Sequence, residues 1–481
     1  MKKLLPLLFA VFVICGLWVR LMAMHNVPFY DWDESIYAQV AREWMRHPGL
    51  ALTYNGSLWF EKPPLLFAII GGLFQVFGTS ELIARVPSLF AGIICLILVY
   101  QSTVSITKNT LAGYASVLLC ASTPYFIERS IVVNVDVFLA LGWLLYASSG
   151  AFRARLIGVC IGAYTKSFLG FIPLVADLSL DLYQKKLTAR KLFESSLIVL
   201  TGLIWHIYMW ATYGEQFVNS HIKDHLISRV TKPIELHFGG KYFYIEKLWD
   251  NYDWLLPMVL VAVVYWLSCF FRNKTTRLLD LHFVVPLIYF VLLTVSKAKL
   301  HWYTFPLIPF CSILIIHVVF RLTTQKHLML VLSIIGALSA VRFIPTFSTI
   351  QPSQSLPPQV ALARCKSVMP PIERISYLVP PTQRKDAHVI EAAQLNIGSS
   401  FIYGSAPTFL FYVDRPVTFY YKADLFLKDL GSYDAMVVHK DDSVLRQKAE
   451  QIFAPGVTPV YTCVREDMVM AVRGTLTPSP K

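Results

Sequence analysis

Two short segments hold charged side chains of the types that catalyse group transfer. Three carboxylates fall within Asp31–Glu34, and Glu61–Lys62 directly precedes two prolines. A carboxylate such as Asp33 or Glu34 can act as a general base or orient a hydroxyl-bearing group, and Lys62 can bind an anion. Each feature also has a structural explanation, because carboxylates cap a helix start and a lysine can reach lipid phosphates over its apolar stem.

Further charged or phenolic side chains stand in or beside apolar runs. A charge is costly in hydrocarbon, so such residues are candidates for a functional site. The candidates are Arg85, Asp136, Lys166, Arg229, Lys241, Lys297, Lys299 and Tyr303. Several cations near a membrane surface suit an anionic ligand, and a lipid-linked phosphate fits both the charge and the location. Asp136 is either a second carboxylate on the acceptor side or a partner of Lys166, and the sequence leaves both open.

Helices must position these residues, and the amino-acid composition predicts that the helices are apolar. Of 481 residues, 55% are hydrophobic and 15% are charged, and the mean hydropathy is +0.53. This composition excludes an ordinary soluble enzyme and predicts a protein that crosses the membrane several times. The formal net charge is +13, and many of the basic residues lie in short loops between apolar runs. This distribution indicates membrane topology rather than nucleic-acid binding.

Long apolar runs predict the membrane-spanning helices. Outside residues 156–182 they are Leu4–Met24, Leu82–Thr107, Thr110–Ile127, Ile131–Phe152, Leu192–Tyr213, Trp254–Phe271, Leu278–Val295, Trp302–Phe320 and His327–Pro345. No small-x-small cleavage site follows the first run, so we expect an uncleaved helix whose amino end lies in the cytoplasm. Two helices of the first outer loop, Ser35–Arg46 and Leu65–Phe77, are expected to lie at the membrane surface.

The segment 156–182 decides the predicted topology. As one helix it would carry Lys166 near its middle. As two short helices meeting at Lys166, it leaves Arg153 and the lysine- and arginine-rich segment 185–191 on one side of the membrane, which the positive-inside rule favours. This choice predicts about 11 spans, with the first outer loop, residues 214–253 and the C-terminal tail on the outer side. A single span would move every later basic loop to the other side.

The tail differs in composition from the rest of the chain. It is richer in charge and proline, and it has β-like runs at Ser400–Tyr403, Val417–Tyr421, Asp434–Val438, Val460–Val464 and Met468–Val472, with a helical stretch at Asp442–Phe453. We therefore predict a membrane all-α bundle over residues 1–345, followed by a small soluble α/β domain over residues 346–481. Cys365 and Cys463 could pair if the tail faces an oxidising compartment.

The order and spacing of the motifs resemble the integral-membrane GT-C glycosyltransferases. The resemblance is to the bacterial aminoarabinose transferases that modify lipid A and to the related protein mannosyltransferases. It rests on Asp31-Trp32-Asp33-Glu34 with Tyr37, Ala41-Arg42-Glu43, Glu61-Lys62-Pro63-Pro64, Ser80-Glu81 with Ala84-Arg85 and Pro87-Ser88, Asp136, Thr165-Lys166, Tyr242–Tyr244, and Ser296-Lys297 with Lys299, Tyr303 and Pro306. The chain departs from the aminoarabinose transferases in having about two fewer predicted spans. The Trp-Trp-Asp signature of the oligosaccharyltransferase branch is absent from the sequence.

The resemblance implies transfer of one hexose or pentose from a polyprenyl monophosphate, such as undecaprenyl phosphate, with inversion. Asp33, Glu34 and Asp136 would be the catalytic carboxylates. Lys62, Arg229, Lys241, Lys297, Lys299 and Tyr303 would bind the donor phosphate, and Glu61, Arg85 and Lys166 would support them. No metal is expected, because cations of the protein can stabilise a departing monophosphate. The alternative is a divalent cation at Glu61 with His225 or His237, since a similar Glu and His hold a metal in the aminoarabinose branch.

The expected setting is a bacterial inner membrane, with the C-terminal domain in the periplasm. The expected partners are the lipid-linked donor, an acceptor such as lipid A, another glycan or protein, and membrane lipid, but no nucleic acid, and the chain is expected to be a monomer. The alternative function is a transporter or flippase for a lipid-linked sugar or phosphate, although such folds often carry internal repeats that this sequence lacks.

Overall fold

The computed structural model describes residues 4–234, 237–272, 274–347, 356–392, 400–404, 406–454 and 460–473. Contacts divide the chain into two compact units, which are described separately below. The first unit comprises Met1–Asn26, Phe60–Lys232 and His237–Ile350, and the second comprises Val27–Trp59, Pro233–Leu236 and Gln351–Lys481.

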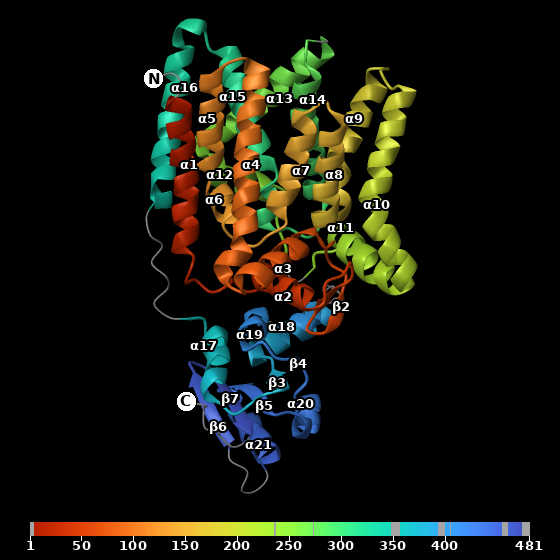
Figure 1. The fold of residues 1–481 in the computed structure, drawn as a ribbon, viewed down its shortest axis with the longest axis vertical. Helices are drawn as coiled ribbons and strands as arrows, with labels where there is room; N and C mark the ends of the chain where they lie inside the picture. Colours follow the sequence, from red (N-terminus) through yellow and green to blue (C-terminus); the bar gives the residue numbers. More distant parts are fainter. Residues whose placement is uncertain are drawn as a thin grey trace. The chain divides into compact units, whose positions relative to one another are not determined.

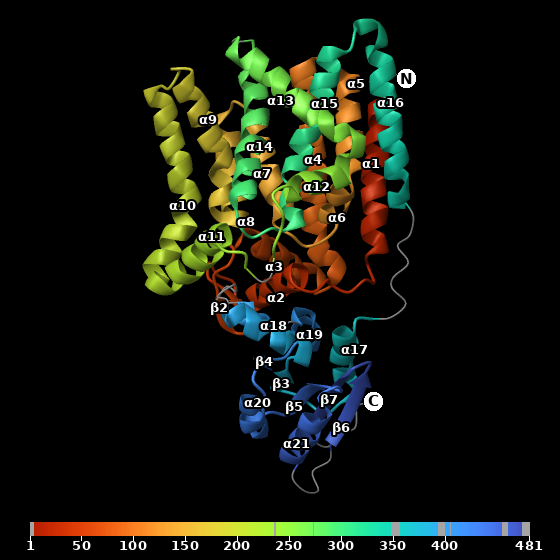
Figure 2. The ribbon, with the colours of Figure 1, turned by 180° about the vertical axis from the view of Figure 1, so that it is seen from behind.

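The first unit is helical, and in Figures 1 and 2 its long helices run side by side. Its α-helices are α1 (Leu4–Ala23), α3 (Leu65–Phe77), α4 (Glu81–Thr107), α5 (Thr110–Ala121), α6 (Pro124–Ser130), α7 (Asp136–Ser148), α8 (Phe152–Lys166), α9 (Ile172–Tyr183), α10 (Ala189–Phe217), α11 (Arg229–Thr231), α12 (Phe243–Tyr252), α13 (Leu256–Phe271), α14 (Arg277–Val295), α15 (Leu307–Leu322) and α16 (Gln325–Phe343). A π-helix, η2 (Val218–Ser228), and short 3-10 turns, η1 (Ser167–Phe171), η3 (Asp253–Leu255), η4 (His301–Thr304) and η5 (Ile344–Phe347), connect them.

The helices bear out the prediction of a multi-pass membrane protein. Among the described residues, five helices are long and apolar enough to cross a membrane, or up to seven if each of two bent pairs is one span. Shorter apolar helices accompany them, at Phe9–Ala23, Leu65–Phe77, Asp136–Ser148 and Leu307–Leu322. The predicted figure of about 11 spans stays a prediction.

The break predicted at Lys166 is confirmed. Residues 152–183 form one long apolar stretch, yet α8 ends at Lys166 and α9 starts after η1. Arg155, near the start of α8, lies 3.5 Å from the carboxylate of Asp177 in α9, so the chain reverses between them. Gly170 makes the close reversal possible, because a Cβ there would collide with the backbone of Ala163.

Two predicted spans have different boundaries in the structure. The run Thr110–Ile127 is two helices, α5 and α6, bent by 74°. The run predicted from Ile131 becomes helical only at Asp136, because the Asn134 side chain accepts hydrogen bonds from the backbone N–H groups of Asp136 (3.0 Å) and Val137 (3.1 Å). This cap sets the start of α7.

The second unit contains a five-stranded sheet in the order β4-β3-β5-β7-β6 and a two-stranded β1-β2 hairpin. The elements are α2 (Asp33–Arg46), β1 (Leu52–Tyr54), β2 (Ser57–Trp59), α17 (Pro358–Arg364), η6 (Cys365–Val368), β3 (Ile375–Leu378), α18 (Pro381–Ala392), η7 (Ser400–Tyr403), α19 (Pro407–Val413), β4 (Val417–Tyr420), α20 (Ala423–Asp429), η8 (Leu430–Ser432), β5 (Ala435–His439), α21 (Ser443–Phe453), β6 (Val460–Arg465) and β7 (Met468–Arg473). β3 pairs in parallel with β4 and β5, whereas β7 pairs antiparallel with β5 and β6.

Most of the predicted β-like runs are strands, but Ser400–Tyr403 is a 3-10 turn instead. The central strand β3 and the β1-β2 hairpin were not predicted. The hairpin had a sequence signal, because Asn55 (φ 53°) and Gly56 (φ 76°) form the positive-φ turn that an Asn-Gly pair favours.

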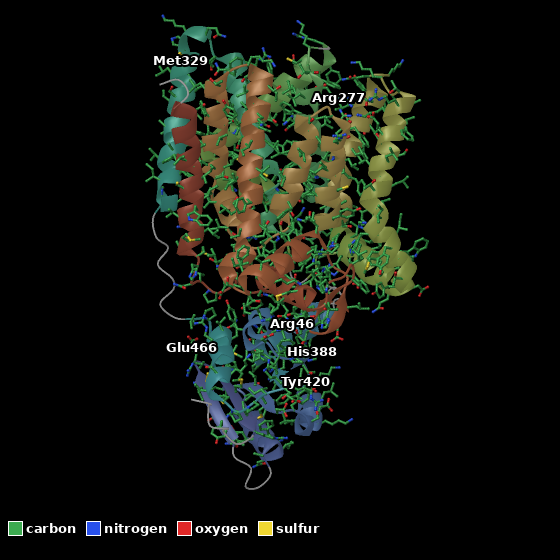
Figure 3. All side chains as sticks on the ribbon, viewed as in Figure 1. Arg46, Arg277, Met329, His388, Tyr420 and Glu466 are labelled. Carbon is green, nitrogen blue, oxygen red and sulfur yellow. A yellow bond between two sulfur atoms is a disulfide. The ribbon has the colours of Figure 1, made fainter. Side chains whose placement is uncertain are left out.

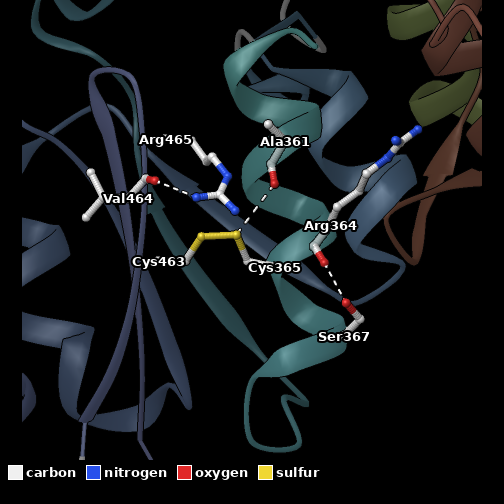
Figure 4. Close-up of a disulfide and its surroundings, with 7 residues drawn as sticks. All are labelled: Ala361, Arg364, Cys365, Ser367, Cys463, Val464 and Arg465. Carbon is white, nitrogen blue, oxygen red and sulfur yellow. Dashed lines mark hydrogen bonds between the residues drawn. A yellow bond between two sulfur atoms is a disulfide. The ribbon is translucent and has the colours of Figure 1, made fainter. Parts of the chain in front are cut away.

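A disulfide joins Cys365 to Cys463 (Figure 4), with Cα atoms 6.4 Å apart. The disulfide connects η6, the turn after α17, to β6, which is an edge strand of the five-stranded sheet. It therefore links the start of the C-terminal domain to its sheet.

The boundary predicted near residue 345 differs from the division that the contacts make, since Val27–Trp59 belongs to the second unit. Polar contacts explain why. Asp31 accepts hydrogen bonds from Gln359 and Thr408, and buried Arg42 donates to the Phe411 carbonyl at 2.7 Å. Burial raises the pKa of Asp31, although these hydrogen bonds act in the opposite direction.

Candidate active site

A polar row on one stretch of helix forms the first part of the candidate site. α10 bends at Gly214, which has φ 49°, and continues into the π-helix η2, a rare form that is frequent at functional sites. His221, His225 and Arg229 follow at intervals of four residues and therefore share one side of the helix.

Each member of the row contacts a different group. His221 Nδ1 lies 2.6 Å from the Phe60 carbonyl oxygen, and His225 Nε2 lies 3.3 Å from Glu61 Oε1. Arg229 Nη1 donates to the Tyr303 hydroxyl at 2.9 Å. The row thus connects the Glu61–Lys62 segment to the residues after α14.

The second part of the candidate site lies where α7 begins and α8 ends. Asp136 is the first residue of α7 and Lys166 is the last residue of α8. The two side chains form an ion pair, in which both are largely buried. Lys166 Nζ also stands 4.5 Å from the centroid of the Tyr303 ring, which is within range of a cation–π contact.

Tyr303 joins the two parts, because its hydroxyl meets Arg229 and its ring face meets Lys166. The structure therefore brings together six of the residues singled out in the sequence. We call them the basic cluster: Glu61, Asp136, Lys166, His225, Arg229 and Tyr303. Lys62 adjoins it through Glu61 and is partly buried.

The segment 296–300 holds Arg229 in place. The backbone N–H groups of Lys297 and Ala298 donate to the carbonyls of Val230 and Arg229, both at 3.1 Å, and Ser296 Oγ donates to the Arg229 carbonyl at 2.8 Å. These bonds fix the backbone that carries the Arg229 guanidinium.

Lys299 lies at the end of α14, where its side chain contacts backbone carbonyls. Its Nζ donates to the carbonyls of Leu293 and Thr294, both at 2.8 Å, at the end of α14. Burial, helped by Lys297, lowers the pKa of Lys299. These contacts are those of a cation that completes a helix C-terminus. The structure therefore supplies a structural role for Lys299, while phosphate binding stays a prediction.

Lys241 and Lys297 have exposed side chains. Lys241 Nζ lies 5.7 Å from the centroid of the Tyr242 ring. Arg85 is fully buried and donates to the Met24 carbonyl at 2.7 Å, so it anchors the end of α1 to α4.

Asp33 and Glu34 belong to the second unit. Asp33 is the partly exposed first residue of α2. Glu34 is buried and accepts a hydrogen bond from the backbone N–H of Tyr30 at 2.9 Å, and it lies in the first turn of α2, where a carboxylate complements the helix dipole. The catalytic roles of both carboxylates stay predictions.

The possible divalent-cation site was predicted at Glu61 with His225 or His237. Glu61 and His225 are in contact, but the described residues include no group of three or more His, Cys, Asp or Glu side chains that could hold a metal ion. Because a zinc site takes three or four protein ligands, these two residues do not fit a metal by themselves. The expectation that no metal is required remains a prediction.

Two contributors to this region were missed in the sequence, Ser167 and His206. Ser167 Oγ lies 2.8 Å from His206 Nε2 and 2.8 Å from His221 Nε2. A histidine in the middle of the apolar run 192–213 was a visible signal for His206. Nothing local distinguished Ser167, whose partners come from a different part of the chain.

The fold and the basic cluster define a membrane protein with a cationic site, and comparison with known proteins shows which proteins the chain resembles. Residues 61–208 match the model of the dolichyl-phosphate-mannose-protein mannosyltransferases. Over 300 residues the chain is 27% identical to an undecaprenyl phosphate-alpha-4-amino-4-deoxy-L-arabinose arabinosyl transferase of Pseudomonas savastanoi pv. phaseolicola, covering 57% of this chain and 54% of the relative. The match to a Photorhabdus laumondii protein with the same description is 23% identical and covers 57% and 52%. The chain thus spans about half the length of the curated relatives it matches.

Solved structures show the same fold. ArnT from Cupriavidus metallidurans bound to undecaprenyl phosphate matches with a TM-score of 0.72 at 14% identity, over 98% of both chains. The archaeal oligosaccharyltransferase AglB from Archaeoglobus fulgidus matches with a TM-score of 0.57 at 12% identity, over 96% of this chain and 73% of AglB. The resemblance to GT-C glycosyltransferases of the aminoarabinose transferase and protein mannosyltransferase kind is therefore confirmed.

Proposed function

We propose that the protein transfers a single sugar from a polyprenyl monophosphate to an envelope acceptor, such as lipid A, another glycan or protein. The observation that carries the proposal is the convergence of Lys166, Arg229 and Tyr303 beside Glu61–Lys62. Two cations and a phenol in a water-poor site are suited to hold a phosphate whose negative charge grows as the sugar leaves. The relatives that carry undecaprenyl phosphate in their descriptions support a donor of this class.

In this mechanism the bond between the anomeric carbon and the phosphate oxygen breaks, and the bonding electrons leave with the phosphate. The acceptor oxygen or nitrogen attacks from the opposite face, so the configuration inverts. Asp33 takes the acceptor proton, or it orients the acceptor while the departing phosphate takes that proton. Lys62 and Arg229 stabilise the phosphate, while Asp136 orients Lys166 through their ion pair.

The outer face of a bacterial inner membrane is the proposed location of the reaction. The Cys365–Cys463 disulfide supports an oxidising compartment for the C-terminal domain, because disulfides persist in the periplasm and are rare in the cytosol.

Asp33→Asn tests the proposal in a deletion strain complemented with each version of the full-length chain. Mass spectrometry of envelope lipids and glycoproteins is expected to show a defined sugar mass restored by wild type, with Asp33→Asn lower by about 10²–10⁴-fold, the usual contribution of a general base. Asp386→Asn, an exposed carboxylate in α18, is the matched control and should restore the mass fully. Restoration by Asp33→Asn equal to that control would remove Asp33 from the mechanism.

The alternative of a transporter makes a different prediction. Sealed vesicles containing the protein would move a lipid-linked sugar across the bilayer without forming a new glycosidic bond. Movement without any new bond in the wild type would contradict the transferase proposal.

A further inference from the structure

Ser167 sits between two buried histidines, immediately after the lysine of the basic cluster. Its hydroxyl lies 2.8 Å from the Nε2 atoms of both His206 and His221. The two histidines expose only 6% and 3% of their surface. Aromatic rings surround them, with Phe168 4.7 Å from the His206 ring and Phe217 4.9 Å from the His221 ring, measured between centroids.

The hydrogen bonds of this cluster have a defined direction. A carbonyl oxygen only accepts, so His221 Nδ1 carries the hydrogen that it shares with the Phe60 carbonyl at 2.6 Å. In the neutral ring, Nε2 of His221 is then the acceptor of the hydrogen bond that the Ser167 hydroxyl donates. The serine oxygen in turn accepts from His206 Nε2. The chain therefore runs from His206 through Ser167 and His221 to Phe60.

The backbone of Ser167 is held in an unusual conformation. Its φ is 58° and its ψ is −136°, a region that residues with a Cβ rarely adopt and that glycine adopts readily. Such strain persists only where surrounding contacts enforce it, and it is concentrated at functional sites. Two side-chain partners and the backbone reversal between α8 and α9 enforce it here.

This hydrogen-bond chain ties together the two parts of the basic cluster. Ser167 directly follows Lys166, which pairs with Asp136 and faces Tyr303. At its other end the chain holds Phe60, which directly precedes Glu61–Lys62. The position of Lys62 relative to Lys166 is thus set by successive hydrogen bonds through Ser167 and His221.

We infer that Ser167, His206 and His221 are positioning residues that set the spacing between Lys166 and the Glu61–Lys62 segment for a phosphate ligand. The inference rests on the proposed function, since it assigns these side chains to the donor-phosphate site. A binding site for a charged ligand loses much of its affinity when its ligating groups shift by about 1 Å. Loss of the Ser167 hydroxyl is therefore expected to weaken phosphate binding although the hydroxyl does not contact the phosphate.

The test separates positioning from stability. Ser167→Gly removes the hydroxyl and relieves the positive-φ strain, whereas Ser167→Ala removes the hydroxyl and keeps the strain. We expect both variants of the full-length chain to bind undecaprenyl phosphate about tenfold or more weakly in detergent. The thermal midpoint of Ser167→Gly should match or exceed that of Ser167→Ala. Thr212→Ala, which removes a hydroxyl bonded to the Tyr208 carbonyl on the exposed side of α10, should bind like wild type.

His221 provides a second, independent test. Glutamine can donate to the Phe60 carbonyl or accept from Ser167, whereas leucine can do neither. His221→Gln is therefore expected to retain more phosphate affinity than His221→Leu. Equal affinities for the two variants, when both remain folded, would contradict the inference.

The remaining outcomes also decide the question. If Ser167→Gly binds undecaprenyl phosphate like Thr212→Ala, the positioning role is wrong. The role is also wrong if affinity falls only in proportion to the folded fraction. If wild type binds the lipid phosphate and Ser167→Gly does not, yet wild type transfers no sugar, the positioning role holds and the proposed transferase function fails.

Discussion

At the scale of single residues, Tyr303 has two contacts that can be separated experimentally. Its hydroxyl accepts from Arg229 Nη1 at 2.9 Å and its ring faces Lys166 Nζ at 4.5 Å. The ring attracts the ammonium through its quadrupole, and the hydroxyl orients the guanidinium. A single side chain thereby places two cations from segments far apart in the sequence.

Replacing Tyr303 by phenylalanine should remove one contact and keep the other. A hydrogen bond to a charged group contributes about 1.5–3 kcal/mol, so Tyr303→Phe is expected to lower kcat/KM for the lipid-linked donor by about 10- to 100-fold. Tyr303→Leu, which also removes the ring, should lower it further. Steady-state transfer assays measure both, with Tyr208→Phe on the exposed side of α10 as control. An unchanged kcat/KM for Tyr303→Phe would show that its hydroxyl has no part in binding the donor.

At the scale of secondary-structure elements, a second charged cluster joins four helices around Asp177 of α9. Its fully buried carboxylate receives hydrogen bonds from Tyr146 of α7 at 2.9 Å and from Arg277 Nε of α14 at 2.9 Å. Arg277 is labelled in Figure 3 at one end of the helices. Lys191 of α10 and Arg155 of α8 also contact it.

Arg155 lies two residues after Arg153, and Lys191 belongs to the segment 185–191, which the positive-inside rule placed on the same side as Arg153. Their convergence on Asp177 agrees with the antiparallel arrangement of α8 and α9. The cluster therefore explains how α8 and α9 are held against α7, α10 and α14.

Asp177→Asn should destabilise the protein strongly, because it leaves buried cations without their counter-charge. Removing one partner of a buried ion pair costs about 3–5 kcal/mol. Glu194→Gln is the matched control on α10, since its partner Arg190 is 87% exposed and an exposed pair contributes about 0–1 kcal/mol. Thermal unfolding in detergent compares the two. Similar midpoints for both variants would mean that the Asp177 cluster does not hold the helices together.

At the scale of the whole molecule, the C-terminal domain depends on a covalent link between distant parts of the sequence. Cys365 and Cys463 are 98 residues apart, and closing a loop of this size restricts the unfolded chain considerably. The other six cysteines are not in disulfides. We therefore expect a reductant to change the stability of the protein through the Cys365–Cys463 bond alone.

Cys463→Ser is expected to destabilise the second unit by about 2–5 kcal/mol, the usual cost of losing a native disulfide. A reductant should have the same effect on wild type and none on the variant, as measured by thermal unfolding of the full-length protein. Mass spectrometry after thiol alkylation, without reduction, should find both cysteines protected. Alkylation of both in protein taken directly from cells would contradict the disulfide and remove its support for a periplasmic domain.

The sequence by itself determined the helices and most of the candidate residues, because both depend on local composition. Apolar runs predicted α3, α4 and α14 to within about two residues. The cost of burying a charge drew attention to Lys166. The break at Lys166 was predicted from the positive-inside rule, which depends on the positions of basic residues in the loops.

Only the tertiary structure decided which distant groups meet. Pairing of β3 with β4 and β5, the packing of Val27–Trp59 with the C-terminal part, and the hydrogen bonds from Ser167 all join residues that are remote in the chain. Lys299 shows the same limit, since its position in the sequence did not reveal that its side chain donates to the carbonyls of Leu293 and Thr294 at the end of α14. Local patterns specify which side chains are available, whereas their partners depend on how the chain reverses between helices, and no short segment encodes that.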